Sequence, residues 1–112
     1  MSDCIFCKIV KGEISSEKVY EDDDCIAIKD INPQAPVHIL VIPKKHIEKL
    51  YDTDDEKLLG KMVIVCSKIA EKLEIKEKGY RIVINTNKWA GQSVDHIHFH
   101  LLGGRIMNWP PG

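Results

Sequence analysis

The sequence predicts one α+β domain in which about five antiparallel strands form a sheet, with one long helix and a short N-terminal helix. Short β-branched runs bounded by turn residues favour the strands, and a longer segment with apolar side chains at helical spacing favours the helix. The length of 112 residues, with 44% hydrophobic and 29% charged residues, is typical of a single globular domain over residues 1–112.

The N-terminal part of the chain predicts a short helix followed by a hairpin. Residues 4–10 form the short helix, and Gly12 suits its end. Residues 18–21 and 25–28 are expected to be two strands, joined by the acidic residues 22–24. The acidic run is interpreted as a solvated turn.

The middle of the chain predicts a buried strand and the long helix. Two prolines in residues 30–36 exclude regular structure, and the almost wholly apolar residues 37–42 predict a central strand covered on both faces. Residues 53–56, Thr-Asp-Asp-Glu, predict a capping box for a helix that runs to about Leu73. The stripe expected to bury one face of this helix consists of Leu58, Met62, Cys66, Ile69 and Leu73.

The C-terminal part predicts two more strands. Residues 79–85 form one strand, residues 86–94 a loop, and residues 96–102 the last strand. The tail over residues 103–112 is expected to be irregular. Its Trp109 should dock on its own domain or on a second subunit, because a large aromatic side chain is rarely left in water.

Three of the five histidines lie in the last predicted strand. Because side chains alternate along a strand, His96, His98 and His100 share one face, and the apolar residues between them point into the core. This row allows two chemistries: neutral imidazoles bind a metal, or one imidazole acts as a nucleophile whose neighbours fix its tautomer. His38, the polar residue of the central strand, needs partners when buried and is a further candidate for the site.

A nucleophilic histidine accounts for more of the sequence than a catalytic metal does. His98 has a histidine on each side, so one ring nitrogen can be held as a donor while the other attacks phosphorus. Ser93 could donate to the phosphate or the leaving group, and Gly91-Gln92-Ser93 could offer backbone N–H groups to an anion. A zinc ion on two histidines would need His38 or a carboxylate as a third ligand and would leave this loop unused.

Charge and composition argue against several other classes of function. The net charge of -1, from 16 basic and 17 acidic residues, gives no reason to expect nucleic acid or membrane as a partner. No apolar run approaches the length of a spanning helix, and the N-terminus lacks the pattern of a signal peptide, so we expect a cytoplasmic location. Cysteines there are usually reduced, so Cys4 and Cys7 are either core residues or half of a zinc site.

Residues 96–102, His-Ile-His-Phe-His-Leu-Leu, resemble the motif of the histidine triad (HIT) superfamily, and other stretches along essentially the whole chain resemble its Hint branch. These stretches are residues 5–6, 30–36, 40–47, 91–94, 103–105 and the final Trp109-Pro110-Pro111-Gly112. The resemblance implies the HIT-like fold and a homodimer that binds purine nucleoside monophosphates such as AMP or GMP. It also implies hydrolysis of nucleoside 5′-phosphoramidates, in which an amine is linked to the phosphate.

The resemblance also assigns roles to residues. It implies that His98 is the nucleophile and forms a nucleotidyl-enzyme intermediate. The other implied catalytic residues are His38, His96, His100 and Ser93. The implied nucleotide-binding residues are Phe6, Ile9, Asp30, Ile31, Asn85, Gly91, Gln92, Ser93, His98, His100 and Trp109. Among these, Asp30 is expected to hold the ribose hydroxyls, and Trp109 to come from the partner subunit.

Many bacterial relatives carry Cys-x-x-Cys near the start and a zinc ion held by two cysteines and two histidines. The matching positions are Cys4, Cys7, His46 and His96. A site with four protein ligands has no open position, so the zinc would be structural, and no cofactor is expected to be required for catalysis.

Other activities stay open at this point. Within the same superfamily, the alternative is dinucleoside polyphosphate hydrolysis or nucleotidyl transfer, although the C-terminal tail resembles the phosphoramidase branch. A zinc-dependent hydrolase and a non-enzymatic nucleotide-binding protein are further alternatives. Lys88, Trp89 and Asp95 depart from the family pattern, which bears on the leaving group rather than on the class of reaction.

Overall fold

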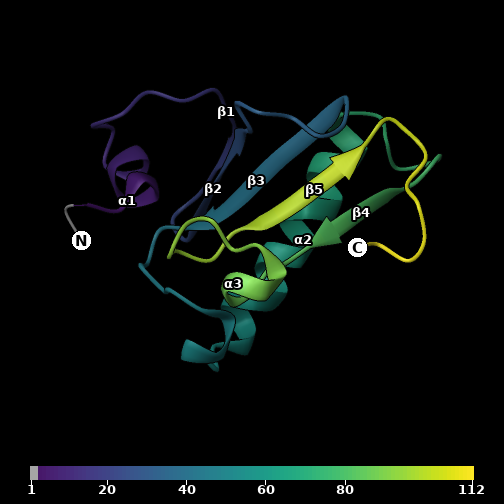
Figure 1. Ribbon diagram of the computed structural model, residues 1–112. Helices are drawn as coiled ribbons and strands as arrows, with labels where there is room; N and C mark the ends of the chain where they lie inside the picture. Colours follow the sequence, from purple (N-terminus) through teal and green to yellow (C-terminus); the bar gives the residue numbers. More distant parts are fainter. Residues whose placement is uncertain (1–2) are drawn as a thin grey trace.

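The computed structural model describes residues 3–112 and confirms the α+β class. Five strands form one antiparallel sheet in the order β1-β2-β3-β5-β4 (Figure 1). In chain order the elements are α1 (Ile5–Val10), β1 (Lys18–Glu21), β2 (Cys25–Lys29), β3 (Val37–Pro43), the short 3-10 helix η1 (Leu50–Asp52), α2 (Glu56–Lys72), β4 (Tyr80–Val83), α3 (Asn87–Ala90) and β5 (Phe99–Gly103).

The long helix α2 packs across one face of the sheet (Figure 1). Its buried side chains are Met62, Val65, Cys66, Ile69 and Ala70. They meet sheet residues Cys25, Ala27, Ile39, Val41, Phe99 and Leu101 in one core cluster. The helical spacing predicted this stripe, except that Leu58 and Leu73 at its two ends are only partly buried. Each large apolar side chain removed from water contributes ~1.5–3 kcal/mol, so this core holds the sheet together.

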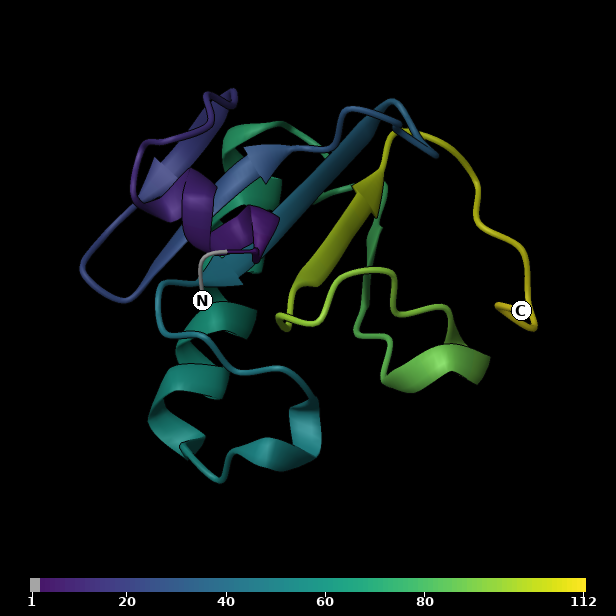
Figure 2. The ribbon, with the colours of Figure 1, turned by 60° about the vertical axis from the view of Figure 1, so that its left-hand side comes forward.

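The opposite face of the sheet carries α1 over part of its width (Figure 2). Phe6 and Ile9 of α1 pack in a second apolar cluster with Ile26, Ile28, Leu40 and Ile42, which belong to β2 and β3. Beyond this cluster the same face continues onto β5, where His100 is only half-buried. The covered part therefore ends where the histidines begin.

The pairing of β3 with β5 brings histidines from distant parts of the chain together. His38 lies opposite Leu102, and Leu40 lies opposite His100. Because residues two apart on a strand share a face, His38 and His100 are diagonal neighbours on the α1 side of the sheet.

The last strand begins later than expected. β5 starts at Phe99, so the predicted strand over residues 96–102 was wrong at its N-terminal end. Residues 96–98 lie outside the ladder, and the backbone N–H of Ile97 donates to the carbonyl of Ile47 at 2.7 Å. The rings of His96 and His98 are consequently not constrained to the alternation of a regular strand.

Two other elements differ in detail from the expectation. The predicted loop over residues 86–94 contains the short helix α3, and β4 ends at Val83 rather than at residue 85. The N-cap of α2 is Asp55, whose carboxylate accepts from the backbone N–H of Leu58 at 3.1 Å, while the Thr53 hydroxyl oxygen accepts from the N–H of Asp55. The cap is therefore displaced from the expected Thr53. None of the helices within residues 3–112 has the length and apolar character to cross a membrane.

Candidate active site

His98 is held with one ring nitrogen tied to the backbone. Its Nδ1 lies 2.8 Å from the carbonyl oxygen of His96, and only 6% of the residue is exposed. A carbonyl oxygen can only accept, so Nδ1 carries the proton and donates. The other nitrogen, Nε2, is then an unprotonated lone pair. Phe6 packs its ring against His98 at 5.0 Å between centroids, in an edge arrangement that restricts rotation of the imidazole.

His38 and His100 form a second hydrogen-bonded unit beside His98. The backbone N–H of Gln34 donates to Nδ1 of His38 at 3.0 Å, which places the proton of neutral His38 on Nε2. That Nε2 lies 2.9 Å from Nδ1 of His100, so His38 donates and His100 accepts. His100 is left with its proton on Nε2. The rings of His98 and His100 are 4.9 Å apart, so an acceptor of that proton would lie near His98.

Burial keeps these histidines neutral near pH 7. Desolvation lowers the pKa of His98, and the hydrogen bond to the His96 carbonyl only partly opposes it. Desolvation also lowers the pKa of His38, against the raising effect of Asp30. For His100, burial and the neighbouring His98 and His38 lower the pKa to about 4. The hydrogen bonds require neutral rings at His38 and His100, because each of these rings accepts at Nδ1, whereas His98 is kept neutral by its burial.

His96 points away from the other two triad residues. Its Nε2 lies 2.8 Å from the carbonyl oxygen of Pro43 and therefore carries the proton. Its Nδ1 lone pair faces the sulfur of Cys4 at 3.3 Å, the sulfur of Cys7 at 3.6 Å and Nδ1 of His46 at 3.2 Å. The predicted zinc ligands thus meet at one point, although they come from α1, the segment after β3 and the segment before β5.

The Cys/His cluster has the chemistry of a structural metal site. One ligand atom from each of the four residues lies within 4.8 Å of all the others. Two sulfurs and two unprotonated imidazole nitrogens are a donor set that tetrahedral zinc takes. Within residues 3–112, a second group has ligand atoms that all lie within 4.8 Å of one another: Asp30, His38 and His100. Neither group contains His98, so a catalytic metal shared by His96 and His98, which the zinc-hydrolase alternative needs, has no matching geometry.

The loop before the triad is braced by the side chain of Gln92. Its Oε1 accepts from the backbone N–H of Asn87, and its Nε2 donates to the carbonyls of Glu48 and Val94 at 2.7 and 3.0 Å. The backbone N–H groups of Gly91 and Gln92 are also used within the protein, since they donate to the carbonyls of Lys88 and Asn87 at the end of α3. The expectation that Gly91 and Gln92 offer free N–H groups to an anion was therefore wrong. Ser93, the next residue, is exposed.

Two of the expected nucleoside-binding residues, Asp30 and Phe6, lie beside the histidines. Oδ2 of Asp30 lies 3.4 Å from Nε2 of His38, and its Oδ1 accepts from the N–H of Asn32. Phe6 and Ile9 are buried beneath the site, but Ile31 is fully exposed. Trp109 is 81% exposed and lies near Arg81, with 6.0 Å from the guanidinium carbon to its ring. In one chain, Ile31 and Trp109 are therefore not walls of an enclosed pocket.

Sequence reasoning missed the groups that fix the tautomers. The acceptors for His96 and His98 are backbone carbonyls, and the donor to His38 is the backbone N–H of Gln34. Backbone groups carry no signal in residue identity. The proline-containing loop over residues 30–36 was the one available hint that a fixed backbone lies near His38.

Comparisons with known proteins identify the family. A model of the HIT domain family matches residues 11–107. The purine nucleoside phosphoramidase of Escherichia coli K12 is 51% identical over 105 residues, covering 92% of this chain and 88% of the relative. An uncharacterized HIT-like protein of Synechococcus elongatus is 51% identical over 112 residues, covering 98% of this chain and 97% of the relative. The crystal structure of a HIT family hydrolase from Legionella pneumophila superposes with a TM-score of 0.96 at 51% identity, covering 98% of this chain and 100% of the other. The chain belongs to the HIT domain family.

Proposed function

We propose that the protein is a purine nucleoside phosphoramidase, which cleaves the P–N bond of AMP-amines through a nucleotidyl-histidine intermediate. One observation carries this proposal: the hydrogen bond from Nδ1 of His98 to the His96 carbonyl, which leaves Nε2 of the neutral ring as an unprotonated lone pair. The name of the Escherichia coli relative supports the same class of substrate.

In the first step, Nε2 of His98 attacks the α-phosphorus, and the P–N bond to the amine breaks. The leaving nitrogen takes a proton and departs as a neutral amine, while the nucleoside monophosphoryl group stays on His98. We assign the proton donor to Ser93 and assign His100 to a phosphate oxygen, because its remaining Nε2–H is the free donor of the His38–His100 unit.

In the second step, water attacks the same phosphorus, and the bond between phosphorus and Nε2 of His98 breaks. Water supplies the oxygen of the released nucleoside monophosphate, and its proton returns to Ser93, which gave one to the amine in the first step. His98 regains its lone pair, since Nδ1 stays protonated on the His96 carbonyl throughout. No metal ion takes part in either step.

The nucleotide would lie with its phosphate over the histidines and its nucleoside toward α1. Asp30 would accept hydrogen bonds from the ribose hydroxyls, and Phe6, Ile9 and Ile31 would contact the base of AMP or GMP. Asn85, which is half-buried, and the backbone N–H of Ser93 would hold the phosphate, while Gly91 and Gln92, whose N–H groups donate to carbonyls of α3, would shape the loop beside it. The support for this placement is that Asp30 lies next to His38 and Phe6 lies against His98.

We assign a structural zinc ion to Cys4, Cys7, His46 and His96. The Nδ1 atoms of the two histidines face the two sulfurs, and Nε2 of His46 lies 3.7 Å from a carboxylate oxygen of Glu48. That separation exceeds hydrogen-bond distance, and Nε2 of His46 is a buried atom without a hydrogen-bond partner among the described residues. Zinc there would tie α1 to the segment after β3 and to the segment before β5. Reduced thiols are needed, which fits a cytoplasmic location.

We also propose that the active form is a homodimer in which Trp109 borders the partner's site. The support is that β4 lies at the edge of the sheet and that Trp109 is mostly exposed in one chain. The partners are then a second copy of the chain and the nucleotide, with no nucleic acid and no membrane.

The direct test is release of AMP from adenosine 5′-phosphoramidate. We expect His98→Ala to lower kcat/KM at least about 10³-fold, because no other neutral imidazole offers a lone pair at this position. His98→Asn is the matched control: its amide can still donate to the His96 carbonyl, but it has no nucleophile, so we expect the same loss. Thermal unfolding of both variants should match the wild type within a few degrees.

Chelation separates this proposal from a metal hydrolase. We expect AMP release by the wild type to persist with a chelator present. Release that stops with the chelator and returns with zinc would contradict a histidine nucleophile. Binding of AMP without any release would favour a nucleotide-binding protein instead.

A further inference from the structure

The segment that follows β5 contacts the proline-containing loop over residues 30–36. Gly104 has a positive φ of +89°, and a Cβ atom at this position would lie 2.8 Å from Cβ of Pro36. The next residue, Arg105, donates from Nε to the carbonyl oxygen of Gln34 at 3.0 Å. Two adjacent residues thus contact this loop from outside, one by close backbone approach and one by a charge-assisted hydrogen bond.

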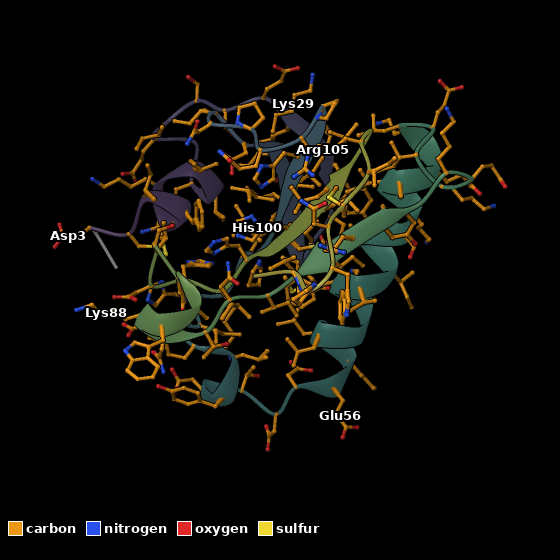
Figure 3. The ribbon with its side chains drawn as sticks, turned by 45° about the vertical axis from the view of Figure 1, so that its right-hand side comes forward. Asp3, Lys29, Glu56, Lys88, His100 and Arg105 are labelled. Carbon is orange, nitrogen blue, oxygen red and sulfur yellow. The ribbon has the colours of Figure 1, made fainter. Side chains whose placement is uncertain are left out.

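Arg105 is held in place on its other side. A terminal nitrogen, Nη1, donates to the carbonyl of Ile106 at 3.0 Å, so the guanidinium bridges the loop and the C-terminal tail. Figure 3 shows Arg105 beyond the end of β5, while His100 lies in the strand nearer the middle of the molecule. The side-chain hydrogen bonds of Arg105 within residues 3–112 go to the loop and to the tail, so its link to the histidines runs through the loop.

The rest of the loop is held by its own atoms and by β3. The N–H of Asn32 donates to Asp30, the side chain of Gln34 donates to the carbonyl of Asn32, and the N–H of Asp30 donates to the carbonyl of His38. The backbone of Gln34 is joined to two other segments: its carbonyl accepts from Arg105, and its N–H donates to His38. The position of the N–H group therefore depends on the bond to Arg105 as well as on the bond to His38.

The N–H of Gln34 favours the tautomer of His100 that carries its proton on Nε2. While it donates to Nδ1 of His38, His38 must donate from Nε2 to Nδ1 of His100, and His100 keeps its proton on Nε2. If this donor moves away, His38 can hold its proton on Nδ1 instead. Then Nε2 of His38 accepts, Nδ1 of His100 donates, and Nε2 of His100 becomes a lone pair that repels a phosphate oxygen.

We infer that Arg105 is a positioning residue for the reaction, which sets the tautomer of His100 through Gln34 and His38, and that Gly104 is glycine so that this contact can form. The inference rests on the proposed function for its catalytic consequence. The chain of three hydrogen bonds, at 3.0, 3.0 and 2.9 Å, is a property of the folded protein whatever the substrate is.

Arg105→Met tests the inference, because methionine keeps an unbranched side chain and removes every donor. The first readout is the tautomer of His38 and His100, read from the ¹⁵N shifts of the ring nitrogens by NMR. We expect both rings to hold the proton on Nε2 in the wild type and to become mixtures of tautomers in Arg105→Met. Arg105→Lys, which retains one donor group, should restore part of the wild-type pattern.

Lys72→Met is the matched control. Lys72 also donates from a cationic side chain to the backbone carbonyl of another segment, here Val19 at 3.1 Å, but it lies on α2. We expect the ¹⁵N shifts of the His38 and His100 rings in Lys72→Met to equal those of the wild type. Unchanged tautomers in folded Arg105→Met, or an equal change in Lys72→Met, would overturn the inference.

The second readout is kinetic. We expect Arg105→Met to lower kcat for AMP release by about tenfold with KM changed by no more than about twofold, because the affected donor acts on the phosphate during bond breaking. A rise in KM with kcat unchanged would show a role in substrate binding and overturn the assignment. If the wild type releases no AMP while the tautomers still shift, the proposed function fails and the positioning chain stands.

Discussion

At the level of single residues, the three histidines of the triad differ because each has a different hydrogen-bond partner. His96 gives its ring proton to the Pro43 carbonyl and offers Nδ1 to the cysteines. His98 gives its proton to the His96 carbonyl and offers Nε2, while His100 accepts from His38 and retains a donor. The proposed function thus takes a metal ligand, a nucleophile and a hydrogen-bond donor to the phosphate from one residue type. His96 was expected to be catalytic, and its nearest link to the chemistry is its carbonyl oxygen.

Burial of His100 makes the stability of the fold depend on pH. Its pKa is lowered to about 4 in the folded protein, against 6.5 for an ordinary histidine. Between these values the unfolded chain binds a proton that the folded protein does not, so the free energy of unfolding falls as the pH drops from 7 toward 4 and the loss is complete below that. Urea unfolding at pH 7 and pH 5 measures this fall in the free energy of unfolding. We expect the fall to be smaller in His100→Gln than in the wild type, by on the order of 1–2 kcal/mol.

Chelator in every sample removes metal binding by the Cys/His cluster from this comparison. His38, His96 and His98 also have a lowered pKa, so the variant should keep part of the pH dependence. Parallel curves for the two proteins would show that His100 is not the group that titrates.

At the level of elements, the helix α3 and the loop after it depend on one side chain. Gln92 accepts from Asn87 at the start of α3 and donates to the backbone of Glu48 and Val94, which lie in separate segments. The amide can make all three bonds only because it has both a donor and an acceptor. The loop that is proposed to hold the phosphate is therefore rigid without contacts from a ligand.

We expect Gln92→Glu to lower the free energy of unfolding by about 1–3 kcal/mol, because it removes both donors and places a carboxylate against two carbonyl oxygens. Urea unfolding measures the loss. In a Trp109→Phe background, the fluorescence anisotropy of Trp89 on α3 should also fall, as the helix gains freedom. Gln34→Glu is the control, since that side chain makes one hydrogen bond, to Asn32, and is exposed. An equal effect in both variants would contradict the bracing role.

The elements that the sequence predicted are those with a periodic apolar pattern. The strand over residues 37–42 and the stripe of α2 follow directly from burial, and the structure has both. The start of β5 and the helix α3 were missed, because they depend on contacts such as Ile97 to Ile47 and Gln92 to Glu48 that join distant segments. In the same way, the histidines were identifiable from their spacing, but their tautomers depend on backbone groups that no residue pattern reveals.

At the level of the whole molecule, one edge of the sheet is left open next to an apolar surface. β4 is an edge strand, and an edge strand presents unpaired backbone groups. Beside it, Val63 and Ile64 on α2 are 43% and 56% exposed, and both border a shallow hollow with Tyr80 of β4. A second copy that pairs along β4 would cover this surface, and it would bring the tail with Trp109 toward a neighbouring site.

This arrangement predicts that the dimer depends on Ile64. At micromolar concentration we expect the wild type to sediment with about twice the mass of the 12.8 kDa chain, and Ile64→Glu to sediment as a single chain, because the interface would bury an unpaired carboxylate. Ile14→Glu is the control: Ile14 is an isoleucine of 38% exposure in the segment after α1, away from β4. Sedimentation equilibrium measures the mass, and release of AMP by the same samples measures activity.

If Trp109 completes the partner's site, the monomeric variant should lose kcat while its tautomers at His38 and His100 stay unchanged. A monomeric wild type, or a monomeric Ile14→Glu, would contradict this interface.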